Sequence, residues 1–245
     1  MANLAASLVG KRNATLGLER MNANVAIALK ELGLDIVDAQ QAIETVRAFK
    51  SPEEVKCIVA SLRATEFAVG RLRDAVSPGL AENQLWSVMH KSLIEQNGDY
   101  VETRLLTAGP RANTWFQESA SYAISKNDLV VLDTDVVGCH GYYSDFSRTL
   151  HAGPDPPTEE ILGPDLTFGD YTDLAWDIPE QYWANRYFVS AHGCGLTEED
   201  PYLHHRGDLP DSGYDGVIEP GMVLCVESYI GNEGGTQGVK LERQS

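Results

Sequence analysis

Acidic side chains stand at the end or in the middle of several apolar runs in the second half of this chain, and their placement restricts how it can fold. The apolar run from Leu129 ends on Asp133, and the run over residues 223–229 contains Glu227. A third run, Val239-Lys-Leu, ends on Glu242. Desolvating an unpaired carboxylate costs several kcal/mol. A stable fold must therefore bring these groups to protein partners or to cations.

Two helices are predicted before these runs. Ser51-Pro52-Glu53-Glu54 has a capping serine, a proline suited to the first helical position and a glutamate that completes a capping box. The apolar residues that follow have helical spacing as far as Val76. Ser77-Pro78-Gly79 ends that helix, and a second helix is predicted over residues 81–96.

The chain then changes to strands. Residues 129–133 and 141–150 are predicted to pair as a hairpin folded about Gly138, and further strands are predicted at 187–191, 222–229 and 238–242. Helices followed by hairpins favour an α+β fold over a parallel βαβ sheet. The segment 154–169 is predicted to be a loop that leads into a short helical piece at 171–176.

The first 50 residues contain one amphipathic helix pattern, over residues 25–32, and one strand pattern at 34–38. We interpret residues 1–50 as the remnant of an N-terminal domain and residues 51–245 as the main domain.

The charge balance excludes some classes of partner. Acidic residues outnumber basic ones by 36 to 19, a formal net charge of −17. Such a field repels phosphate backbones and anionic lipid, so we expect a small-molecule substrate and neither nucleic acid nor a membrane. The four cysteines are scattered without a CxxC pair, and no run approaches the roughly 20 apolar residues of a membrane span. We expect reduced thiols and a cytoplasmic location.

The acids form an ordered set with one histidine. The predicted hairpin places Asp133 and Asp145 across from each other, where two carboxylates repel unless a proton or cation lies between them. His192 ends an apolar strand. Each residue alone has an ordinary structural explanation. Together they offer oxygen and nitrogen donors suited to two divalent metal ions; the set is Asp133, Asp145, His192, Glu227 and Glu242.

This order resembles that of the M24 metallopeptidase superfamily. Leu132-Asp133, the stretch Gly141-Tyr-Tyr-Ser-Asp-Phe-Ser-Arg-Thr149 and Glu219-Pro-Gly-Met222 look like the segments that carry or precede its metal ligands. The resemblance covers about residues 50–245. It implies a pita-bread fold, here with a truncated N-terminal segment, and a two-metal site.

One departure points to a branch of that family. Peptidases commonly have Asp-x-Gly with the second aspartate eleven residues on, whereas this chain has Asp-x-Asp and twelve residues from Asp133 to Asp145. The variant resembles the dimethylsulfoniopropionate (DMSP) lyase, or DddP, branch. That resemblance implies that Asp135 is a sixth ligand and that the metal is iron, with manganese, zinc or cobalt as alternatives. It also implies a homodimer that converts DMSP to dimethyl sulfide and acrylate.

The same resemblance implies the catalytic roles. The base of the branch is an aspartate six residues after the histidine, a position that Glu198 occupies here. If Glu198 is not the base, Tyr187 or a metal-bound hydroxide is the next candidate. The sulfonium group needs an aromatic wall, because a cation over a ring face gains roughly 0.5–2 kcal/mol, and the candidates are Trp115, Tyr202 and Tyr187.

Two alternatives remain open at this point. The same site could hydrolyse a C–N bond, as in Xaa-Pro peptidases or ectoine hydrolase. The chain could also be an inactive truncated paralogue, because it is short near residue 160 and ends three residues after Glu242.

Overall fold

The computed structural model describes residues 15–114, 116–153, 172–173, 175 and 177–244, together with Leu4 and Ser7. The chain forms two compact units, Met1–Arg47 and Ala48–Ser245. None of the helices in these described parts combines the length and the apolar character that a membrane span requires.

The first unit is a small α/β element. Strands β1 (Thr15–Leu18) and β2 (Asp35–Asp38) pair in parallel, and helices α2 (Ala23–Glu31) and α3 (Gln40–Arg47) follow them in turn. Leu29 and Leu34 are buried in a small apolar cluster with side chains of both strands. The helix and the strand predicted near residues 25–38 are confirmed; β1 and α3 were not predicted.

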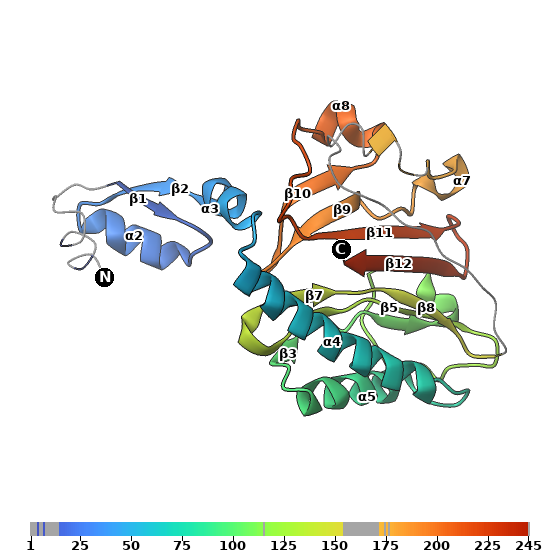
Figure 1. The fold of residues 1–245 in the computed structure, drawn as a ribbon. Helices are drawn as coiled ribbons and strands as arrows, with labels where there is room; N and C mark the ends of the chain where they lie inside the picture. Colours follow the sequence, from blue (N-terminus) through green and yellow to red (C-terminus); the bar gives the residue numbers. More distant parts are fainter. Residues whose placement is uncertain are drawn as a thin grey trace. The chain divides into compact units, whose positions relative to one another are not determined.

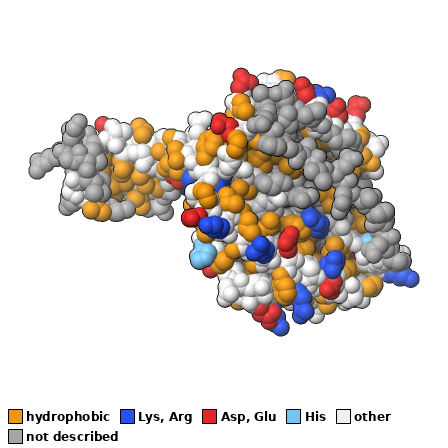
Figure 2. Space-filling model, in the orientation of Figure 1, with side chains coloured by type: hydrophobic (Ala, Val, Ile, Leu, Met, Phe, Trp, Pro, Cys, Tyr) orange, Lys and Arg blue, Asp and Glu red, His pale blue; other side chains and the backbone are white. Residues whose placement is uncertain are grey.

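The second unit begins with the two predicted helices, α4 (Pro52–Ala75) and α5 (Glu82–Glu95). The capping box is present, because Ser51 Oγ accepts from the Glu54 N–H and Glu54 accepts from the Ser51 N–H. The helices pack on each other and on the strands through a buried apolar cluster that includes Ala68, Leu72 and Met89. Charged and apolar side chains are interspersed over the face that α4 and α5 present in Figure 2.

The predicted hairpin forms about Gly138, but each of its arms is broken into two strands. Its first arm is β5 (Leu129–Leu132) and β6 (Asp135–Val137), and its second is β7 (Tyr143–Asp145) and β8 (Arg148–His151). Strand β5 pairs with β8 and lies beside β4 (Leu106–Ala108), whereas β6 pairs with β7 and lies beside β3 (Tyr100–Val101). The turn is held close to α4, since a Cβ at Gly138 would be 1.9 Å from Ser61 Oγ.

A four-stranded antiparallel sheet completes the unit, in the order β10 (Glu198–His204), β9 (Val189–Cys194), β11 (Leu224–Gly231) and β12 (Gly238–Gln244). Strands β9, β11 and β12 were predicted, but β10 was not. The short helices are η1 (Gly109–Ala112), η2 (Cys139–Gly141), α7 (Glu180–Trp183), η3 (Arg206–Asp208) and α8 (Leu209–Ser212).

Strand β12 brings this sheet against the hairpin. The Lys240 N–H donates to Thr149 Oγ1 over 3.0 Å, and the Glu242 N–H donates to the Ser147 carbonyl over 3.3 Å. Within this unit, the hairpin strands lie between α4 and α5 on one side and β11 and β12 on the other (Figure 1). The loop predicted at 154–169 lies outside the described residues, as does most of the helical piece predicted at 171–176.

Candidate metal centre

The six predicted ligands come from five strands and one strand break. Asp135 and Asp145 are cross-strand partners on β6 and β7, and Glu227 and Glu242 are cross-strand partners on β11 and β12. Asp133 lies in the break between β5 and β6, and His192 lies on β9. Every one of them is buried. Cross-strand partners share a face of a sheet, so each pair of acids points into the same space.

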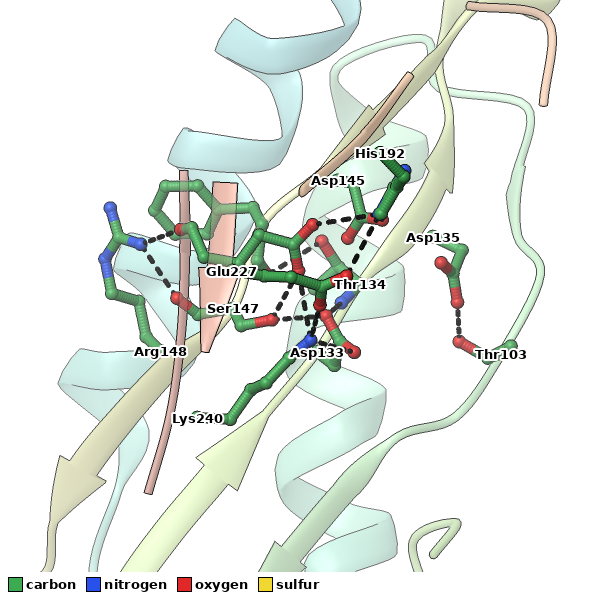
Figure 3. A network of polar contacts seen from close by, with 12 residues as sticks. Thr103, Asp133, Thr134, Asp135, Asp145, Ser147, Arg148, His192, Glu227 and Lys240 are labelled. Atoms are coloured by element: carbon green, nitrogen blue, oxygen red, sulfur yellow. Dashed lines mark hydrogen bonds and ion pairs between the residues drawn. The ribbon is translucent and has the colours of Figure 1, made fainter. Parts of the chain in front are cut away.

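His192 lies at the centre of the cluster. Its Nε2 is 3.6 Å from Asp145 Oδ2, 3.4 Å from Glu227 Oε1 and 3.5 Å from Glu242 Oε1. Ser147 Oγ donates to Asp133 and lies 2.7 Å from Glu242 Oε2, so it links the strand break to β12. Figure 3 shows Asp133, Asp145, His192 and Glu227 pointing toward one another from the hairpin and the four-stranded sheet. The structure therefore brings Asp133, Asp145, His192, Glu227 and Glu242 together.

Asp135 faces a second group of acids. Its carboxylate accepts a hydrogen bond from Thr103, as Figure 3 shows. Oxygens of Asp135, Asp145 and Glu198 lie within 4.8 Å of one another. Atoms of Asp145, His192, Cys225 and Glu242 form another group within the same limit. Asp145 belongs to both groups, so the site offers two adjacent positions for cations. The thiol of Cys225 was not predicted to be near this site.

Burial and mutual repulsion keep most of these acids from ionising easily. Burial raises the pKa of Asp133 to about 6, an effect that Lys240 opposes and Glu242 reinforces. Burial also raises the pKa values of Asp135, Asp145 and Glu227 well above the ordinary range, and nearby carboxylates add to the rise. Sites that bind cations or protons often contain clustered carboxylates with raised pKa values.

The pKa values of two members of the cluster shift in the directions that ion pairing favours. Burial alone would lower the pKa of His192, but Glu242 and Glu227 raise it to about 10. Burial alone would raise the pKa of Glu242, but Lys240 and His192 lower it to about 2. In the metal-free protein the protonated imidazole therefore takes part of the role that a cation would have among these acids, and it must lose its proton to bind a metal ion.

Lys240 supplies a second positive charge among these acids, and it was not predicted from the sequence. Its side chain is completely buried, contacts Glu227, and places Nζ 3.5 Å from both Asp133 Oδ2 and Glu242 Oε2. Burial would lower its pKa, but these carboxylates raise it well above the ordinary value. The signal was available, because residues two apart on a strand share a face and Glu242 was already assigned to the site.

Three of the four predicted catalytic and substrate-binding residues lie in the part of the chain that the structure describes. The buried ring of Tyr187 lies 4.1 Å from Lys240 Nζ. The ring centroid of Tyr202 is 6.3 Å from that of His192, and Tyr202 packs against the buried cluster of Tyr187, Val189 and Tyr229. The side chain of Glu198 is half-buried. Trp115 lies outside the described residues.

The donors fit divalent metal ions. Asp145 Oδ1 is buried without a hydrogen-bond donor among the described residues, and Glu227 Oε1 and Glu242 Oε1 are buried with only long ion pairs to His192 Nε2. Buried acceptors without donors are costly, and metal ions are the partners that carboxylate and imidazole donors suit. The residues that would hold the ions are Asp133, Asp135, Asp145, His192, Glu227 and Glu242.

Buried acids lie between a hairpin and a four-stranded sheet, and two helices pack against the hairpin. This arrangement is the pita-bread fold with a candidate metal site. The chain belongs to metallopeptidase family M24, whose model matches residues 56–244. It is 33% identical to dimethylsulfoniopropionate lyase DddP of Roseovarius nubinhibens, an alignment that covers 96% of this chain and 58% of the lyase.

Other similar proteins have peptidase names. The chain is 27% identical to the Xaa-Pro dipeptidase of Lactobacillus helveticus, over 84% of this chain and 59% of the dipeptidase. The solved structure of prolidase from Pyrococcus furiosus matches with a TM-score of 0.75 at 20% identity, over 97% of this chain and 75% of the prolidase. The chain thus spans about three fifths of the length of the DMSP lyase and of the Xaa-Pro dipeptidase.

Removing metal is expected to lower the melting temperature. A ligand that binds only the native state at 100 times its dissociation constant stabilises by about 2.7 kcal/mol, which is roughly 5–11 °C for a chain of this size. The measurement is thermal unfolding with and without chelator. An unchanged melting temperature, in protein first shown to contain metal, would contradict the assignment of these residues as ligands.

Proposed function

We propose that this protein is a metal-dependent carbon–sulfur lyase that cleaves DMSP into dimethyl sulfide and acrylate. The observation that carries the proposal is the position of Glu198, whose carboxylate lies within 4.8 Å of oxygens of Asp135 and Asp145. A carboxylate at this place can take a proton from a substrate held at the metal ligands. The sequence similarity to a named DMSP lyase supports the same reading.

The elimination needs one base and one leaving group. Glu198 takes the proton from the carbon next to the substrate carboxylate, and the electron pair of that C–H bond becomes the C=C bond of acrylate. The C–S bond breaks as its electrons move to sulfur, so neutral dimethyl sulfide leaves. Divalent ions held by the six ligands would supply Lewis acidity toward the substrate carboxylate.

The aromatic residues fit the positively charged end of this substrate. Tyr202 packs against the cluster that contains Tyr187. The Tyr187 ring centroid is 4.1 Å from Lys240 Nζ, and the Tyr202 ring centroid is 6.3 Å from that of His192. A ring face attracts a cation such as a sulfonium. Tyr187 and Tyr202 are therefore proposed to orient the sulfonium group, and Trp115 remains a sequence prediction for the same wall.

Hydrolysis of a C–N bond is the second candidate, because a relative named Xaa-Pro dipeptidase is 27% identical. Incubation with DMSP and, separately, with Xaa-Pro dipeptides distinguishes the two. We expect dimethyl sulfide and acrylate in equal amounts and no proline. Proline release without dimethyl sulfide would replace the lyase by the hydrolase. Neither product, from protein that binds no metal, would indicate an inactive paralogue.

Further properties are proposed on the similarity to the lyase branch alone. Iron is the proposed metal, ahead of manganese, zinc and cobalt, and elemental analysis of the purified protein tests it. A homodimer is proposed in the same way, and light scattering tests it. The cytoplasmic location is proposed instead from the scattered cysteines, and fractionation of cells tests it.

A further inference from the structure

A buried ion pair lies outside the ligand cluster. Lys50 Nζ is 2.7 Å from Glu199 Oε1, and the two side chains are only 2% and 1% exposed. Lysine and glutamate are almost never fully buried unless they are paired. This pair therefore has a structural or functional reason that a surface ion pair would not need.

Lys50 is fixed at the start of the second unit. Its backbone N–H donates to the Gly221 carbonyl over 2.9 Å, and its Nζ also lies 3.3 Å from the Ala48 carbonyl. The next residue, Ser51, caps α4. These backbone contacts restrain Lys50, so its ammonium group has a defined position from which it binds Glu199.

Glu199 is the second residue of β10 and directly follows Glu198. Successive side chains of a strand point to opposite faces. Glu199 is bound to Lys50, so Glu198 points the other way, toward Asp135 and Asp145. The ion pair thus fixes the backbone from which the proposed base extends.

The strand pairing around Glu198 is irregular, so it needs such a restraint. Glu198 and Glu199 pair with Cys194 and Gly193, but the register shifts before Tyr202 pairs with His192. Gly193 in β9 and Gly195 just after it leave the space that β10 occupies. A Cβ at Gly193 would be 2.3 Å from the Asp200 carbonyl oxygen, and one at Gly195 would be 2.1 Å from Glu199 Oε1.

We propose that Lys50 and Glu199 are positioning residues that set the place of Glu198 at the metal centre. The inference rests on the proposed role of Glu198 as the base. A charge-assisted hydrogen bond is short and directional, so it fixes the register of β10 where the ladder does not. Apolar side chains of similar size would fill the same space without fixing the register of β10.

The test replaces both charges at once. Removing only one partner leaves a buried charge, whereas replacing a buried pair by apolar residues is often neutral for stability. In Lys50→Met/Glu199→Met we expect a melting temperature and a metal content close to those of the wild type. A misplacement of the order of 1 Å can cost about 100-fold in rate, so we expect kcat to fall roughly 10- to 100-fold. KM should change little.

A double-mutant cycle separates positioning from general damage. If the pair acts through Glu198, Lys50→Met/Glu199→Met should cause no further loss of kcat in a Glu198→Gln background. A full additional loss, or a wild-type kcat in the double variant alone, would overturn the proposal. Lys56→Met is the matched control, because Lys56 pairs with Glu53 at the surface of the same region, and it should leave kcat unchanged.

A readout without turnover separates this proposal from the proposed reaction. The Glu198 carboxylate lies within 4.8 Å of oxygens of Asp135 and Asp145, so moving or neutralising it changes the surroundings of a metal ion held by those ligands. The visible spectrum of bound Co²⁺ is sensitive to these surroundings, and Lys50→Met/Glu199→Met and Glu198→Gln should each change it. A wild type that releases proline rather than dimethyl sulfide would end the lyase proposal, and the cycle would then be measured with the dipeptide. A double variant whose Co²⁺ spectrum matches the wild type would end the positioning proposal in either case.

Discussion

Glu198→Gln is expected to lower the rate of dimethyl sulfide release by roughly 100- to 10,000-fold, the usual contribution of a general base. Glutamine keeps the shape of the side chain and its hydrogen bonding but cannot accept the substrate proton. The strand that carries it, β10, stays anchored by Glu199 and Lys50. We therefore expect the variant to fold and to keep its metal content, which elemental analysis and thermal unfolding measure beside the rate.

Glu227→Gln provides the comparison. Its carboxylate lies in the cluster around His192 and Lys240, and a neutral amide is a poorer ligand than a carboxylate. This variant should lose metal and activity together. Dimethyl sulfide release near the wild-type rate by Glu198→Gln would remove Glu198 from the mechanism. Tyr187 would then be the first candidate for the base.

The fold was predictable where local signals agree with the tertiary structure. The capping box at Ser51 and the helical spacing after it define α4, and Ser77-Pro78-Gly79 separates it from α5. The hairpin about Gly138 follows from two apolar runs and a glycine turn. Its strand breaks were not visible, because Asp133 and Phe146 read as continuations of the runs. The breaks turn Asp133 and Ser147 toward β12 instead.

Strand β10 was missed because its sequence has no apolar alternation. Residues 198–204 alternate between half-buried and buried positions, but Glu199 occupies one of the buried positions and is satisfied by Lys50. A partner 149 positions away in the sequence cannot be inferred from local pattern. The sequence Glu198-Glu199-Asp200 therefore looks like a run of surface acids.

The convergence of the acids was predictable for a different reason. A carboxylate in an apolar strand needs a partner wherever the strand lies, so several such residues are expected to share one site. The presence of Lys240 on the same face as Glu242 was predictable from their spacing, but its burial and its contacts were not. The approach of β12 to β8 buries Lys240 and brings it to Asp133 and Glu227.

Lys240→Met is expected to destabilise the metal-free protein strongly and the metal-loaded protein much less. Removing one partner of a buried ion pair costs about 3–5 kcal/mol, or roughly 6–20 °C in melting temperature at this chain length. In the metal-free state, Asp133, Glu227 and Glu242 would lose a cation that contacts or nearly contacts all three. Bound divalent ions supply that positive charge from another source, so they should offset most of the loss.

The interaction between the substitution and the metal is the quantity that tests this argument. Thermal unfolding of wild type and Lys240→Met, each with chelator and with saturating metal, gives four melting temperatures. Metal should raise that of the variant by more than that of the wild type. By linkage, the variant should then also bind metal more tightly. Lys91→Met, at an exposed lysine beside Glu95, should change none of the four. An equal loss in both states would mean that Lys240 stabilises the fold by packing alone, because packing does not depend on whether the carboxylates are neutralised by a metal ion.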